Sequence, residues 1–204
     1  MVVSMRSFSP STASYFAARG PIVAHALIWV EARNRSTGAV EAIGFYTGAD
    51  HSDFVINGET RTYYGAGAAL NIDPIRLQTG IAVRTQRVVL SQVAPEVLLA
   101  IRGYEPRHAP VEIHRAIYDP ETRLLVDTPH RLFKGYIDKV VVTTPAKGQS
   151  GQIELTLASA ARALTVPLTR KRSDASLRAR APADAFRKYA SITDKVETLW
   201  GRKK

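Results

Sequence analysis

The segment FVINGETRTYY, residues 54–64, constrains the fold more strongly than any other part of the chain. Its centre, Asn57-Gly58, stands between two stretches of residues with high strand propensity. Both central residue types tolerate the positive φ that a two-residue type I′ turn requires. The segment therefore predicts a tight β-hairpin that is specified almost entirely by local sequence.

Further strand patterns recur along the chain at the spacing expected of hairpins. In 21–33, apolar residues occupy both sets of alternating positions, which is typical of a strand buried on both faces. Two short helices are expected, one at 9–20 between Ser9 and Gly20 and one at 95–103 between Pro95 and Gly103. About eight strands then predict a mainly β fold, an antiparallel β-barrel or sandwich. The other strands are expected at 39–47, 81–92, 111–118, 124–126, 132–144 and 152–158.

Basic residues concentrate towards the C-terminus. The net charge is +10, and Arg170 to Lys204 contain eleven basic and four acidic residues, a net charge of +7, which leaves +3 for the first 169. Three parts are therefore predicted: an N-terminal helical segment over 1–20, a β-rich domain over 21–167 and a basic C-terminal arm over 168–204. Residues 168–182 are expected to be extended. The aromatic spacing in 183–200 fits a helix or a strand that pairs with another chain, and both stay open.

The absence of cysteine narrows the chemistry available to the chain. It excludes disulfides, a thiolate nucleophile and metal sites that need sulfur ligands. The sequence also contains no Gly-x-Ser-x-Gly nucleophile elbow and no glycine-rich nucleotide loop. We therefore expect a protein that is not an enzyme and that has no cofactor.

Asp50, His51 and Asp53 form the most polar cluster ahead of the predicted hairpin. Imidazole and carboxylate groups can bind a divalent metal, which makes a metal-dependent hydrolase one hypothesis. The spacing matches no established metal motif, however, and Asp and Ser side chains commonly bond to the backbone of tight turns. A turn is favoured over a metal site. His114, which alternates with apolar residues in 111–118, is expected to be a packed imidazole.

Membrane insertion is not expected. The longest apolar stretch, 21–30, is much shorter than the roughly 20 residues that a membrane-crossing helix needs. The N-terminal residues MVVSMRSFSPSTASYF also lack the basic start and apolar centre of a secretory signal.

Four segments occur in an order that resembles a known family: a polar loop at Gly48–Asp53, a Gly-Tyr segment at Ile101–Ile113, the FKGYID segment at Phe133–Asp138, and a strand at Gln152–Ser159. Together they resemble the tail-tip and baseplate hub proteins of long-tailed bacteriophages and gene transfer agents, a hub-domain family related to lambda-like minor tail proteins. The C-terminal TRKRSDASLRARAPADAFRKY also looks like the closing segment of phage tail assembly proteins. The likeness covers residues 25–201.

The resemblance implies a structural virion protein of the tail tip, which forms a ring at the distal end of the tail tube. It further implies a homo-oligomer, with a trimeric ring as the first expectation and a hexamer as the alternative. The partners would be the distal tail ring, a tail fibre or spike, and other hub proteins. Relatives with a cysteine-rich C-terminal portion hold an iron–sulfur cluster, which this cysteine-free chain lacks the ligands to bind.

The basic arm would supply contacts between subunits, because guanidinium groups bond carboxylates at two points and a poorly apolar arm gains order only on a partner surface. Two alternatives stay open: a distal tail ring or tube-capping adaptor, and a nucleic-acid-binding protein that uses the same arm. Nucleic acid is not the expected partner, because no helix-turn-helix, RNA-binding or zinc pattern accompanies the basic residues. The candidate arm contacts are Arg170, Lys171, Arg172, Arg178, Arg180, Phe186, Tyr189 and Trp200.

Overall fold

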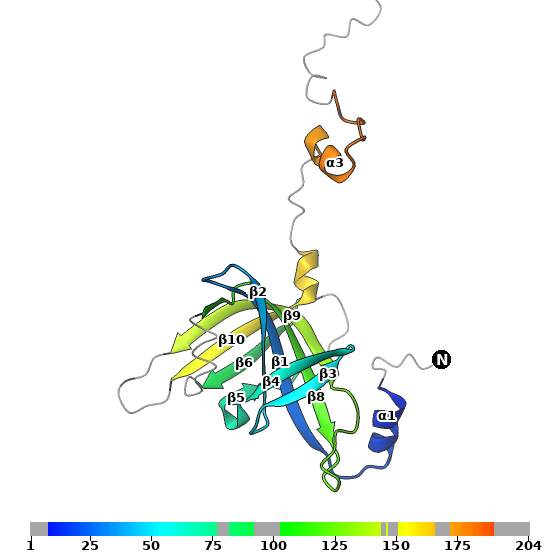
Figure 1. The fold of residues 1–204 in the computed structure, drawn as a ribbon, viewed down its shortest axis with the longest axis vertical. Helices are drawn as coiled ribbons and strands as arrows, with labels where there is room; N and C mark the ends of the chain where they lie inside the picture. The colour runs from blue at the N-terminus through cyan, green and yellow to red at the C-terminus, as the bar shows by residue number, and fades with distance from the viewer. Residues whose placement is uncertain are drawn as a thin grey trace, which may run out of the picture. The chain divides into compact units, whose positions relative to one another are not determined.

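The computed structural model describes residues 8–76, 82–91, 103–143, 146, 151–165 and 172–189. The predicted mainly β fold is confirmed, and Figure 1 shows its strands as one strongly curved sheet. The strands are β1 (Val23–Asn34), β2 (Val40–Tyr46), β3 (Ser52–Ile56), β4 (Glu59–Gly65), β5 (Leu70–Ile72), β6 (Thr85–Ser91), β7 (Tyr104–Glu105), β8 (Pro110–Tyr118), β9 (His130–Thr143) and β10 (Gln152–Ser159). The helical elements are α1 (Pro10–Ala17), η1 (Gly67–Ala69), η2 (Ala160–Leu164) and α3 (Asp174–Arg180).

The sheet order is β3-β4-β2-β1-β8-β9-β10-β6-β5, and β7 pairs with the end of β1. All neighbours are antiparallel except β2 and β4, which run parallel over two residue pairs, so the sheet is mixed and open. The described residues form ten strands where about eight were expected for the chain, because β5 and β7 are too short to show an alternating pattern. The strand expected at 124–126 is absent: Leu125 makes only an isolated bridge to Tyr118.

Strand β1 is buried on both faces, as its sequence predicts. Ile28 and Val30 on one face join the larger apolar cluster, which β6, β8, β9 and β10 complete. Leu27 on the other face joins a second cluster, where the β3–β4 hairpin contributes Phe54 and Tyr63. Each fully buried side chain of this size contributes about 1.5–3 kcal/mol to folding. The hairpin therefore lies over the face of β1 that would otherwise meet solvent.

The predicted hairpin is confirmed. Asn57 has φ 54° and Gly58 φ 84°, as a type I′ turn requires, and the pairing runs from Ile56–Glu59 to Ser52–Tyr63. Gly44 on β2 lets the hairpin approach closely, since a Cβ there would lie 2.7 Å from the ring of Tyr63. Local turn chemistry thus forms the hairpin, and Gly44 on another strand leaves the space in which it packs.

Helix α1 confirms the N-terminal helix prediction, with a difference at its end. The Ser9 side chain accepts a hydrogen bond from the backbone N–H of Thr12, as an N-cap does. The helix ends at Ala17, and Arg19 rather than Gly20 adopts the left-handed conformation, with φ 53°. The Ser9 and Ser11 hydroxyls donate hydrogen bonds to Asp127, which ties α1 to the loop before β9.

The chain divides into two compact units, Met1–Ala163 and Leu164–Lys204. In the second unit, the extended conformation expected for 168–182 is wrong for Asp174–Arg180, which form α3. Ser173 caps this helix, and Asp174 and Arg178 form an ion pair one turn apart, so local caps and charges favour a turn of helix. Residues 183–189 are turns and irregular chain rather than helix or strand. Of the helix expected at 95–103, residues 95–102 lie outside the described residues.

Candidate functional site

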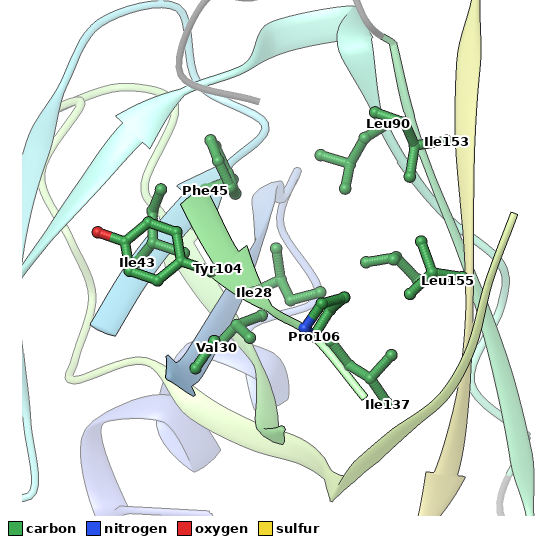
Figure 2. A pocket seen from close by; sticks show the side chains of 12 residues that line it. Ile28, Val30, Ile43, Phe45, Leu90, Tyr104, Pro106, Ile137, Ile153 and Leu155 are labelled. Atoms are coloured by element: carbon green, nitrogen blue, oxygen red, sulfur yellow. The ribbon is translucent and has the colours of Figure 1, made fainter. Parts of the chain in front are cut away.

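An apolar pocket of about 60 Å³ lies against the larger cluster. Figure 2 shows Ile43, Phe45 and Tyr104 on one side of it, facing Leu90, Ile153 and Leu155 on the other. Its volume is well below the roughly 300–1,000 Å³ typical of ligand pockets. The pocket therefore accepts at most a small apolar group.

The polar atoms near this pocket are already bonded. The Tyr104 hydroxyl donates to Glu41 Oε2 at 2.7 Å, and the Asn34 amide donates to the other Glu41 oxygen at 3.0 Å. The hydrogen bond to Glu41 raises the pKa of Tyr104, so its hydroxyl stays protonated and acts as a donor. The pocket thus provides packing surface and no acid–base pair.

The loop with Asp50, His51 and Asp53 forms hydrogen bonds where β2, β3 and β4 meet. The His51 Nδ1 atom accepts a hydrogen bond from the Gly65 N–H at 3.3 Å, and the Asp50 carbonyl accepts one from the Tyr46 hydroxyl. Asp53 lies exposed on β3, paired in register with Thr62. Within the described ranges, no group of three or more His, Cys, Asp or Glu side chains is placed to hold a metal ion.

A single carboxylate on β8 forms ion pairs with three cations from two elements, β4 and β9. Glu112, whose side chain is 13% exposed, lies 3.1 Å from Arg61 of the hairpin, and 3.5 Å and 3.0 Å from Arg131 and Lys134 of β9. Burial opposes its ionisation, but hydrogen bonds from Lys134 and Arg61 outweigh burial and hold the pKa of Glu112 below its usual range. The Arg61 guanidinium also lies 5.0 Å from the Trp29 ring, a cation–π distance. The network joins the hairpin to the sheet and leaves this face positively charged.

His114 is packed, as expected, and lies beside Glu112 on the same face. Its side chain is 1% exposed, and its Nε2 atom is 3.9 Å from Glu112 Oε2. Within the described part of the chain, its Nδ1 atom has no hydrogen-bond partner. Burial lowers the pKa of His114 to about 4, against the attraction of Glu112, so the ring is neutral near pH 7. A buried polar atom without a partner costs about 1–3 kcal/mol, and His114 Nδ1 shares this condition with the Tyr63 hydroxyl of the β body.

The candidate arm contacts are only partly described. Arg170, Lys171 and Trp200 lie outside the described residues. Arg178 is held by Asp174 at 2.9 Å, whereas Arg172 and Arg180 are exposed. Phe186 and Tyr189 are 87% and 63% exposed, a large apolar surface for so short a segment. The structure thus brings basic and aromatic arm residues together on one small unit.

Sequence patterns pointed to His114 but not to the network around it. Arg61 and Glu112 are 51 residues apart and meet because the hairpin lies over β1 and β8. The sequence carries one signal for Glu112: it is a charged residue in the middle of a predicted strand, between the apolar residues Val111 and Ile113. Alternation alone assigns such a residue to a solvent face.

No protein-family model matches the chain, and the comparison with curated proteins likewise gives no match. In the part of the chain that the structure describes, no helix has the length and apolar character needed to cross a membrane.

Proposed function

We propose that this protein is a structural, non-enzymatic subunit of a phage tail tip or baseplate: a hub that joins the tail tube or distal ring to fibres or a central spike. It would act as a ring-forming homo-oligomer in the virion, a trimer in the first instance. The order of sequence motifs from Gly48 to Ser159 is what suggests this family.

One observation carries the proposal. A unit separate from the β body holds basic residues and two strongly exposed aromatic side chains, Phe186 and Tyr189. Exposed aromatics beside arginines are the residue types enriched at protein interfaces. Burying each ring against a neighbour would contribute about 1.5–3 kcal/mol, enough to hold an arm on an adjoining subunit.

The β body offers complementary contact surfaces. Among the strands that the structure describes, β3 and β5 stand at the two ends of the sheet order, where further strands can pair. Val55 on β3 is 50% exposed, so this edge also presents an apolar side chain. An open edge and a separate arm are both means by which ring subunits join their neighbours.

The test measures assembly of the full chain with and without the aromatic contacts. Phe186→Ser combined with Tyr189→Ser should shift the purified protein from a ring-sized species to monomer in analytical ultracentrifugation and in particle images. Arg115→Gln, an exposed substitution on β8, is the control and should assemble normally. A wild-type chain that is monomeric at all concentrations and never found in particles would overturn the proposal.

The charge of the arm favours a second candidate, binding to nucleic acid. The net +7 of Arg170–Lys204 would then make contacts with phosphates, and affinity would fall steeply with salt. Binding to a DNA duplex that persists at 150 mM salt and disappears when residues 170–204 are deleted would favour this alternative over the hub.

A further inference from the structure

A polar pocket of about 320 Å³ opens where α1, the hairpin turn and the β8–β9 pair meet. Liquid water occupies about 30 Å³ per molecule, so the space suits a small ion with part of its hydration shell. The polar groups that line it come from four parts of the chain: Ser9 and Thr12 at the N-terminus of α1, Asn57 of the turn, His114 of β8, and Thr128, His130 and Arg131 just before and at the start of β9.

His114 gives this pocket a feature that simple surface clefts lack. The side chain is almost wholly buried, yet it lines the pocket, and its Nδ1 atom has no hydrogen-bond partner among the residues that the structure describes. Its Nε2 atom lies towards Glu112 at 3.9 Å. The Nδ1 atom itself is covered, so a ligand in the pocket would satisfy it, and recover the cost of that buried nitrogen, once the ring turns this nitrogen towards the pocket.

The charges around the pocket favour an anion. Glu112 is shared among Arg61, Arg131 and Lys134, and Arg61 also pairs with Glu59 at 3.6 Å, so two carboxylates face three permanent cations. Arg131 is the cation that lines the pocket, and its contact with Glu112 is the longest of the three, at 3.5 Å. Its guanidinium has further N–H donors beyond the one used there.

Besides Glu112, which pairs with the pocket-lining Arg131, a second carboxylate, Asp127, stands next to the pocket-lining Thr128. Its Oδ2 atom accepts hydrogen bonds from Ser9 and Ser11, and its Oδ1 atom accepts one from the Thr128 N–H at 2.6 Å. These hydrogen bonds lower the pKa of Asp127 to about 2, with those from Ser11 and Ser9 the largest causes. The carboxylate is thus fully engaged, and it does not line the pocket.

We propose that this pocket binds a small oxyanion, held by Arg131, the Asn57 amide, the Thr128 hydroxyl and the His114 ring. His114 takes up a proton when the anion binds, because the negative charge of the anion offsets the burial that otherwise keeps the ring neutral. The imidazolium then donates hydrogen bonds from both nitrogens. The groups that face His114 are Glu112 of its own strand, Arg61 of the hairpin, and His130 and Arg131 of β9. The site belongs to one subunit, so it stands independently of the hub proposal.

The experiment titrates sodium sulfate into the full chain while the histidine ring resonances are followed by NMR, with sodium chloride at equal ionic strength as reference. Sulfate should shift the His114 and His130 signals saturably, and its affinity should rise by up to about tenfold per pH unit between pH 7 and 5. A parallel titration with sodium acetate separates a free inorganic oxyanion from the carboxylate of a peptide: tighter binding of one or the other identifies the source.

Matched variants assign the effect to the pocket. Arg131→Gln removes the lining cation while Glu112 keeps Arg61 and Lys134, and it should weaken binding about fivefold or more. Asn57→Gly removes the lining amide and keeps a residue that accepts positive φ. Arg115→Gln removes an exposed charge from the opposite face of β8 and should leave the affinity within about twofold. Shifts no larger than those with chloride, or equal loss in Arg131→Gln and Arg115→Gln, would overturn the proposal and leave the pocket as a water site.

Discussion

At the scale of single residues, the polar groups on the outer face of β8 show how burial changes a side chain's chemistry. Glu112 and His114 are two residues apart, and both lie under the hairpin. Glu112 stays ionised because cations surround it, whereas His114 becomes neutral because burial outweighs the attraction of Glu112. Under the same hairpin, Glu112 therefore keeps its negative charge, whereas His114 is neutral.

The pH dependence of stability follows from His114. Its pKa is about 4 in the folded chain and near 6.5 when unfolded, so the unfolded chain binds the proton more readily between these values. The free energy of unfolding should fall as the pH falls from 7 to 5, by up to about 1.4 kcal/mol per pH unit, with no contribution above the unfolded pKa.

Urea unfolding at pH 7, 6 and 5 measures this slope. His114→Gln should flatten it, whatever the variant's absolute stability, and Arg115→Gln should keep it. A His114→Gln slope equal to that of the wild type would show that another group governs the dependence.

At the scale of elements, the β3–β4 hairpin connects local sequence to tertiary packing. Its turn is specified by Asn57 and Gly58, and its strands then supply Phe54 and Tyr63 to the second apolar cluster. Burial raises the pKa of Tyr63 to about 12, against the effect of the adjacent Arg61, because this side chain is buried in the second cluster, whereas Val55 on the other side of the hairpin is exposed. The turn pattern made the hairpin predictable. The face that the hairpin covers was not predictable, because its position depends on β1 and β8.

Gly58→Val tests the turn by itself. No atom lies within 4 Å of the position that a Cβ would take, so the substitution adds backbone strain without a clash. At φ 84° a β-branched residue should lower the free energy of unfolding by about 1–3 kcal/mol. Gly58→Asn is the matched control and should cost much less, since Asn tolerates positive φ. Equal losses in the two variants, measured by urea unfolding, would contradict the turn argument.

At the scale of the whole molecule, the β body and the C-terminal unit are separate compact parts. Both apolar clusters lie within residues 27–157, so the body has its own core. The C-terminal residues bring most of the net charge and two exposed aromatics but, in their described part, no buried apolar residue. The hub proposal accounts for this composition, because such an arm would gain stability by binding a partner's surface.

Truncation separates folding from assembly. A chain that ends after Thr169 should keep the thermal midpoint of the full-length protein within a few degrees, because it retains both clusters. It should lose the assembled species in analytical ultracentrifugation. Normal assembly of the truncated chain would remove the arm from the proposed interface, and a collapse in its stability would show that the arm completes the body.

The sequence by itself determined most of the longer strands, the type I′ turn at Asn57-Gly58 and the helix capped by Ser9, because these depend on alternation, backbone φ preferences and capping within a few residues. Only the tertiary structure decided that the hairpin covers one face of β1, that Arg61 meets Glu112, and that His114 lines a polar pocket. These contacts join residues far apart in the chain, and their energies come from burial and charge, which no local pattern records.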